Sequence, residues 1–287
     1  MANRFWVGGT GTWDSASTAF WAATSGGAGG QTVPGTADVA IFDGSSGGGT
    51  VTVDSPNGAG VVTVQTITMG AFTGTLDFAT NNNNVTLSVA FSGTGSGTRT
   101  LNMGSGTWTC TGNASIIFDF TTMTNLTLSA ASATLVCNLT AATSRNIIFG
   151  AAASIGTITI GANTSGGDVV IQAGASTTLT IGTLNISAPN VVTIAGSGSR
   201  VYAITNGFNF SGTSSAPIGF GANTGTSIPT LTTANAMTAN WCSLNRLTLA
   251  GGGSLTATNS FDLGGITISG GGTKSITPPS SGHVIGG

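Results

Sequence analysis

Paired carboxylates are the first chemistry to look for in this chain, because two acids about 5 to 9.5 Å apart cut glycosidic bonds. All eight acidic residues are aspartate. Asp77 and Asp119 lie in the settings Leu-Asp-Phe and Phe-Asp-Phe, and Asp54, Asp168 and Asp262 are the other candidates. Because Asp77 and Asp119 alternate with apolar residues, we expect both to face solvent on strands. The sequence therefore predicts no catalytic pair and no enzyme.

Other reactive residues are equally sparse. The one histidine, His283, has no partner nearby in the sequence, and Cys110, Cys137 and Cys242 are widely spaced without a CxxC pair. We expect the cysteines to be small buried residues. Asp38 and Asp43 supply too few oxygen ligands for calcium, which takes about 6 to 8. The sequence thus predicts no catalytic, cofactor-binding or metal-binding residues and no cofactor.

The charge distribution argues against two classes of partner. The six basic residues are scattered singly, whereas phosphate binding needs clustered Lys and Arg. No run approaches 18 consecutive apolar residues, the length typical of a membrane span. The first residues lack the apolar core of a secretory signal. We therefore expect no nucleic-acid partner, no membrane partner and synthesis in the cytoplasm.

Alternation of apolar and polar residues recurs along most of the chain, as in Thr50 to Val53 and Arg99 to Met103. This two-residue period is typical of strands, and glycine-rich clusters such as 93–97 separate the segments as turns. Outward positions are mostly Thr instead of Lys or Glu, which favours stacked coils over an antiparallel sandwich. The sequence predicts an all-β, right-handed parallel β-helix with coils of about 20 to 30 residues. We expect the asparagine run 81–84 to form a loop or a stack of turns between coils instead of a binding site.

Composition divides the chain into five segments. Residues 1–43 hold three of the five tryptophans and are predicted to form an aromatic N-terminal cap over an exposed coil end. Residues 44–205 are predicted to be β-helix coils, and 206–245, which contain Pro217 and Pro229, an irregular break or insertion. Residues 246–277 are predicted as final strands and 278–287 as an extended tail. The candidate cap residues are Trp6, Trp13, Asp14, Trp21, Pro34, Asp38, Phe42 and Asp43.

Three further aromatic residues, Trp108, Tyr202 and Trp241, leave two interpretations open. If their rings project outward, they are stacking platforms for a glycan. If they point inward, they pack in the core or cover a coil end. Alternation alone does not assign their faces.

The opening block resembles known proteins. The stretch Trp6-Val-Gly-Gly-Thr-Gly-Thr-Trp13-Asp14 is similar to the start of β-helical repeats in autotransporter passenger domains. Together with Thr73 to Asn82, which reads Thr-Gly-Thr-Leu-Asp-Phe-Ala-Thr-Asn-Asn, it resembles more closely a group of tailed-phage virion proteins. The resemblance covers roughly the first 130 residues and implies a structural role without shared catalytic residues.

The resemblance and the composition together lead to one expected function and two alternatives. We expect a structural protein on the surface of a tailed-bacteriophage virion, as a capsid decoration or a head fibre. Its partners would be other capsid or tail proteins and further copies of itself, for example in a homotrimer. The alternatives are a tail fibre or adhesin that recognises a host surface glycan, and a polysaccharide depolymerase.

Overall fold

The computed structural model describes residues 1–139, 142–196, 199–222 and 228–280. These residues form two units, one of residues 1–136 and 148–150 and the other of residues 137–147 and 151–287, apart from the undescribed positions. Strands dominate both units, and the single helix among the described residues is the short 3-10 helix η1 (Thr18–Phe20). The all-β prediction is confirmed.

The first unit is built from short strands that alternate between buried and more exposed positions, as in Thr50-Val-Thr-Val, where both valines are buried. Its strands are β1 (Asn3–Trp6), β2 (Gly11–Trp13), β3 (Trp21–Ala22), β4 (Val39–Ile41), β5 (Thr50–Val53), β6 (Val61–Thr68), β7 (Thr75–Asp77), β8 (Asn84–Ser92), β9 (Arg99–Asn102), β10 (Thr107–Cys110), β11 (Ile116–Phe120) and β12 (Leu126–Ser129). Strands β13 (Thr134–Cys137) and β14 (Arg145–Phe149) contribute residues to both units.

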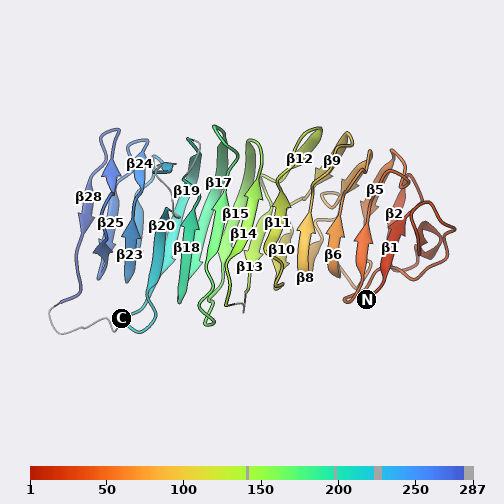
Figure 1. Ribbon diagram of the computed structural model, residues 1–287, viewed down its shortest axis with the longest axis horizontal. Coiled ribbons are helices and arrows are strands. Elements are labelled where there is room, and N and C mark those ends of the chain that lie inside the picture. Colours follow the sequence, from red (N-terminus) through yellow and green to blue (C-terminus); the bar gives the residue numbers. More distant parts are fainter. Residues whose placement is uncertain (140–141, 197–198, 223–227, 281–287) are drawn as a thin grey trace. The chain divides into compact units, whose positions relative to one another are not determined.

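The second unit continues the same pattern, with longer strands at its start. Its strands are β15 (Ala153–Ile160), β16 (Val169–Gln172), β17 (Thr178–Ser187), β18 (Asn190–Ile194), β19 (Val201–Ser211), β20 (Ile218–Ala222), β21 (Thr230–Thr232), β22 (Met237–Asn240), β23 (Cys242–Asn245), β24 (Thr248–Ala250), β25 (Leu255–Thr258), β26 (Phe261–Asp262), β27 (Thr267–Ile268) and β28 (Lys274–Ile276). Corresponding strands of neighbouring coils lie side by side in each unit, as β15 does with β17 and β17 with β19 (Figure 1).

Parallel pairing in register between successive coils makes each unit a β-solenoid. In the first unit, β2, β5, β7, β9 and β12 form one ladder, in which Thr50 aligns with Thr75 and Thr75 with Thr100, so that a coil is 25 residues long. In the second unit, β16, β18, β20, β23 and β26 form one ladder and β22, β25 and β28 another. The β-helix prediction is confirmed.

Coil length falls toward the end of the second unit. Thr230 aligns with Thr248 and Thr248 with Thr267, which gives coils of 18 and 19 residues, below the expected range of about 20 to 30. The turns between these strands are short, and positive-φ glycines such as Gly251 and Gly252 make them. A shorter coil encloses a narrower interior.

Residues 206–245 differ from the predicted irregular break. They include β20, β21, β22 and β23, all paired in parallel with neighbouring coils. Pro217 and Pro229 directly precede β20 and β21. At these positions a missing backbone N–H removes no bond from the interior of a strand, so proline is compatible with regular coils. Most of the predicted tail, 278–287, and His283 with it, lies outside the described residues.

Residues 1–43 form the first strands of the first unit and bury an aromatic cluster. Trp6, Trp13, Trp21 and Phe42 are fully buried, and their rings meet mostly edge-on or tilted, as in the Trp6–Trp21 pair with centroids 5.3 Å apart. Strand β3 runs antiparallel to β1, unlike the coils that follow. An antiparallel strand over a buried aromatic cluster closes the start of a parallel ladder, which is the role of a cap.

Candidate functional site

The two main candidate acids, Asp77 and Asp119, lie in separate sheets and each binds the turn that follows it. Asp77 ends β7, where its carboxylate accepts hydrogen bonds from the Ala79 N–H at 3.0 Å and the Thr80 hydroxyl at 2.5 Å. Asp119 lies in β11, in the other sheet, and accepts a hydrogen bond from the Thr121 N–H at 3.0 Å. Neither pairing nor hydrogen bonding brings these two carboxylates together.

Asp77 corrects one expectation. It occupies the outward ladder between Thr52 and Asn102, as alternation predicted, yet it is buried. The side chain folds back over the turn that follows β7, so the carboxylate is covered by the groups it binds. A buried, hydrogen-bonded carboxylate of this kind stabilises a turn.

The other three acids bind side chains, two of them distant in the sequence. Asp54 accepts a hydrogen bond from the Ser55 hydroxyl, and Asp168 accepts one from the Ser144 hydroxyl. Asp262 contacts Lys274. These contacts are the bonds expected of carboxylates that fix turns and coil ends.

Two of the three candidate glycan platforms are core residues, which corrects that interpretation. Trp108 is fully buried, packs against Phe78 with ring centroids 4.6 Å apart, and donates its indole N–H to the Met103 carbonyl at 3.3 Å. Because a sugar stacks only on an exposed ring face, Trp108 is unable to serve as a platform.

Tyr202 is buried in the second unit. Its hydroxyl accepts a hydrogen bond from the Ala173 N–H at 3.2 Å and lies 2.9 Å from the Ala195 carbonyl, to which it donates. Burial raises the pKa of Tyr202 to about 12, against the smaller lowering effect of those hydrogen bonds and of Arg200. The third candidate, Trp241, is partly exposed and has a left-handed backbone, with φ of 51°.

The cap aspartates share a turn motif that the sequence interpretation missed. Asp14 accepts a hydrogen bond from the N–H two residues later, that of Ala16, and Asp43 does the same with Ser45. In both turns the serine three residues later, Ser17 or Ser46, accepts a hydrogen bond from the aspartate N–H. The signal is an aromatic residue followed by Asp-x-x-Ser, which occurs at 13–17 and at 42–46.

Asp38 and Pro34 hold the cap differently. Asp38 binds the Ala2 N–H through one carboxylate oxygen and the Gly35 N–H through the other, at 2.9 and 3.2 Å. The Pro34 carbonyl accepts a hydrogen bond from the Asn57 side chain at 3.0 Å. The first residues of the chain are thereby tied to later parts of the first unit.

The asparagine run connects neighbouring coils, so the predicted stack of turns is present. The Asn81 amide donates to the Val53 carbonyl of the preceding coil at 2.8 Å. Asn82 accepts hydrogen bonds from the N–H and the hydroxyl of Ser105 in the next coil, at 2.8 and 2.9 Å, and Asn84 accepts one from the Thr107 N–H. Amide side chains thus satisfy backbone groups at a corner of the solenoid.

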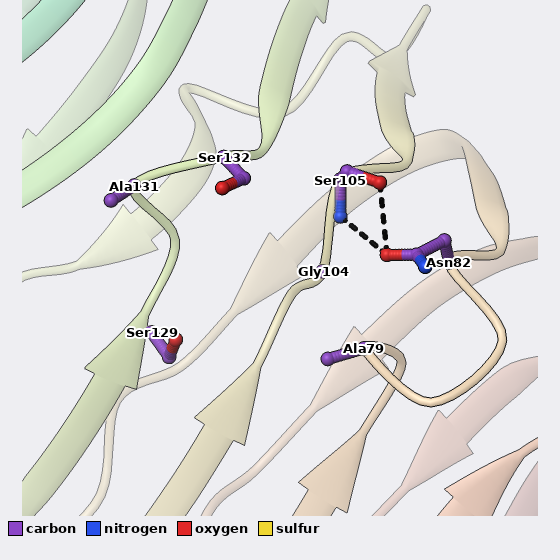
Figure 2. A pocket seen from close by; sticks show the side chains of 7 residues that line it. All are labelled: Ala79, Asn82, Gly104, Ser105, Ser129, Ala131 and Ser132. Carbon is purple, nitrogen blue, oxygen red and sulfur yellow. Dashed lines mark hydrogen bonds between the residues drawn. The ribbon is translucent and has the colours of Figure 1, made fainter.

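An open depression of about 280 Å³ lies beside this corner (Figure 2). Seven residues line it, and none is charged or aromatic: Ala79, Asn82, Gly104, Ser105, Ser129, Ala131 and Ser132. Such a lining offers hydroxyl and amide hydrogen bonds to a neutral polar ligand, and it contains no acid or base that would activate a serine hydroxyl. It is a candidate binding site in the first unit.

Burial suppresses thiol chemistry at two cysteines. It raises the pKa of Cys110 to about 11 and that of Cys242 to about 12, although a backbone hydrogen bond lowers each slightly. All three cysteines are buried, as predicted. Since the thiolate is the reactive form, the Cys110 and Cys242 side chains are inert at neutral pH.

Within the described ranges, no three His, Cys, Asp or Glu residues gather closely enough to hold a metal ion. The same residues include no helix with the length and apolar character needed to cross a membrane. Comparison with known proteins returned no matching family model, no matching curated protein and no matching solved structure.

Proposed function

We propose that this chain is a structural protein on the surface of a tailed-phage virion, as a capsid decoration or a head fibre. One observation carries the proposal: the acids that chemistry would require are each bound into a local turn or coil end, while uncharged Thr, Ser and Asn side chains link coil to coil. The resemblance of the Trp-rich opening block supplies the virion context. A solenoid of this kind is a stiff support whose outer surface needs little charge.

The proposal is tested by finding the protein in particles of the phage that encodes it. Mass spectrometry of purified particles should detect the chain, and cryo-electron microscopy should place it on the capsid lattice. Density at the tail instead would refute the decoration role and support the fibre alternative. Absence from particles would refute a virion role altogether.

An exposed apolar groove supports self-association as part of this function. Val191 and Leu263 are 48% and 62% exposed, and they line a groove of about 170 Å³ together with Gly219 and Ser243. Exposed apolar surface of this kind is a common feature of interfaces between copies. Light scattering should give a mass that is a multiple of 27.9 kDa, and the double change Val191→Asp with Leu263→Asp should return it to the monomer value. A monomeric parent chain would refute self-association.

The depression beside the asparagine corner favours a second candidate function, recognition of a neutral host surface glycan. Its serine and asparagine groups match the hydrogen bonds of a polyol. Filling it by Ser132→Phe should abolish binding of host surface polysaccharide, whereas Ser187→Phe, on an exposed residue in the second unit, should leave it intact. Equal binding by both variants, or no binding by the parent chain, would refute this function. Release of new reducing ends, lost on Asp77→Asn or Asp119→Asn, would instead indicate the depolymerase.

A further inference from the structure

The last coil of the second unit carries charged residues at positions that the preceding coils fill with apolar side chains. In the ladder of β20, β23 and β26, the buried residues Phe220 and Leu244 align with Asp262. In the ladder of β22, β25 and β28, Met237 and Leu255 align with Lys274 in the same way. Both charges therefore occupy inward register positions.

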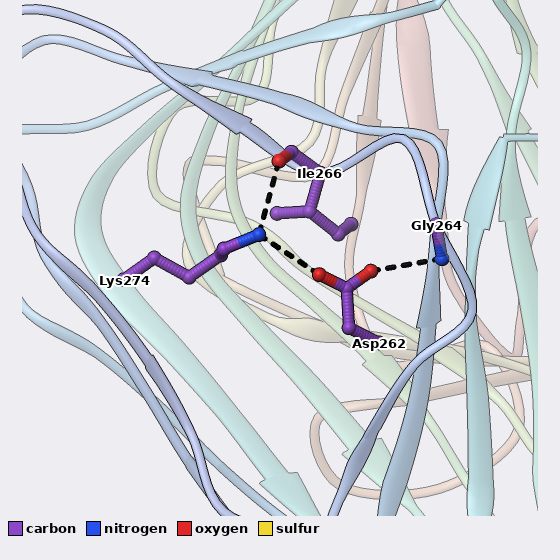
Figure 3. Close-up of polar contacts among 4 residues, drawn as sticks. All are labelled: Asp262, Gly264, Ile266 and Lys274. Carbon is purple, nitrogen blue, oxygen red and sulfur yellow. Dashed lines mark hydrogen bonds and ion pairs between the residues drawn. The ribbon is translucent and has the colours of Figure 1, made fainter.

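Asp262 and Lys274 meet across the interior of this coil. The Lys274 ammonium lies 2.8 Å from one Asp262 carboxylate oxygen and also donates to the Ile266 carbonyl at 3.3 Å (Figure 3). The other carboxylate oxygen accepts a hydrogen bond from the Gly264 N–H at 2.9 Å. Partial burial by itself would raise the pKa of Asp262, but these hydrogen bonds and the Lys274 charge hold it below its ordinary value.

The pair retains contact with water, since the Lys274 and Asp262 side chains are 36% and 29% exposed. A further layer of protein over this end would remove that water from both groups. Desolvating an ion pair costs several kcal/mol per ion, which the attraction between the charges does not reliably offset. Contact with water at this end of the solenoid is therefore more favourable than contact with another layer of protein.

The last coil has unpaired strand edges. Strands β26, β27 and β28 pair with no later strand among the described residues, so their outer edges present backbone N–H and C=O groups. Such an edge accepts a strand from another molecule unless it is blocked. Charged side chains that point inward are one of the devices that block it.

We propose that the Asp262–Lys274 pair ends the apolar interior of the solenoid and prevents a second copy of this chain from stacking on that end. The occupant excluded is a second copy because its own last coil, turned to face this one, has the same width and strand spacing. Restoring the apolar ladders at both positions removes the block and leaves the strand edges unchanged.

The test compares three variants with the parent chain by sedimentation velocity over a range of concentrations. Asp262→Leu with Lys274→Leu should at least double the mass of the parent species as concentration rises. Asp262→Lys with Lys274→Asp keeps the pair with its charges exchanged, and it should retain the parent mass. Thr267→Leu with Ser275→Leu adds the same apolar bulk at exposed positions of β27 and β28, and it should not double the mass.

Hydrogen exchange over 255–276 shows whether the coil stays folded in each variant. An unchanged mass for the double-leucine variant overturns the proposal, whether protection is kept or lost, because loss would mean that the pair only holds the coil together. Association of the charge-exchanged variant, or equal association of the Thr267→Leu/Ser275→Leu control, overturns it as well. Doubling in the double-leucine variant alone supports it.

Discussion

Replacing Arg99 tests how a solenoid with few charges uses one of them. The Arg99 side chain is 1% exposed and all its donors point at backbone carbonyls. The Nε and Nη2 groups bind the Gly93 carbonyl at 3.1 and 2.6 Å, and Nη1 binds that of Gly97 at 2.9 Å. Nη1 and Nη2 also reach the carbonyls of Thr124 and Thr122 in the next coil, at 3.2 and 2.8 Å. The guanidinium thus ties two neighbouring turns together.

The expected cost follows from the four carbonyls. Arg99→Met keeps most of the apolar stem but leaves these carbonyls without their donor. The Gly93 carbonyl is buried, so its loss should cost about 1 to 3 kcal/mol. The bonds to Gly97, Thr122 and Thr124 are only partly buried, so water replaces them at a smaller cost. The loss should therefore exceed about 1 kcal/mol. Burial lowers the pKa of Arg99, but the guanidinium stays charged, so all five donors remain in place at neutral pH. Arg99→Lys offers three donors in place of five. Its free energy of unfolding should therefore lie between those of the parent chain and Arg99→Met.

Urea unfolding followed by tryptophan fluorescence measures the loss, and hydrogen exchange locates it. Protection should fall first at 93–97 and 122–125, the two turns that Arg99 joins. The matched control is Arg4→Met. The guanidinium of Arg4 makes exposed hydrogen bonds to Thr32, and their loss should lower the free energy of unfolding by less than about 1 kcal/mol. If the free energy of unfolding of Arg99→Met is within about 1 kcal/mol of that of the parent chain, the hydrogen bonds from Arg99 to backbone carbonyls are not a major source of stability.

Three further predictions concern other buried groups. Tyr202→Phe should cost about 1 to 3 kcal/mol in urea unfolding because the hydroxyl bonds to Ala173 and Ala195 are lost, and a neutral result would contradict this. Folding raises the thiol pKa of Cys110 to about 11 and that of Cys242 to about 12. The contribution of the buried neutral thiols to the free energy of unfolding is therefore fully present below about pH 8.5 and is lost as the pH rises toward those values. Alkaline unfolding should therefore shift to higher pH on replacing both with alanine, and both thiols should resist alkylation until the chain unfolds. Trp13→Ala should cost about 3 to 5 kcal/mol and expose the cap to protease, unlike the same change at the partly exposed Trp241.

Much of the fold was predictable because the alternation of apolar and polar residues predicts which side chains lie on the buried face of each strand. The segments around Val51 and Val53, and around Leu101 and Met103, have their apolar residues at buried positions as the period of two requires. The burial of Trp6, Trp13 and Trp21 follows a different signal, the gathering of three of the five tryptophans in residues 1–43. Coil length was less so, because it depends on turns, and glycine turns as short as those after β24 follow no fixed repeat.

The site predictions failed for two different reasons, one at Asp77 and the other at the aromatic residues. Asp77 holds an outward position but folds over its own turn, so alternation overestimates its exposure. Trp108 and Tyr202 were left open between surface and core, and both are core residues. Trp108 is in phase with Cys110 and Tyr202 with Ile204, so the phase of each strand carried the answer.

Phase also identifies the charges that matter most in this chain. Arg99 is in phase with Leu101 and is buried, and Lys274 is in phase with Ile276 and takes an inward register position. In a solenoid the inward positions are nearly all apolar, so a charge at one of them costs desolvation unless it performs a specific structural task. Arg99 satisfies turn carbonyls within the stack, and Asp262 with Lys274 closes its end. Arg145 is likewise buried and in phase with Ile147. An inward phase in the alternating pattern therefore narrows the 14 charged residues to the few that occupy core positions.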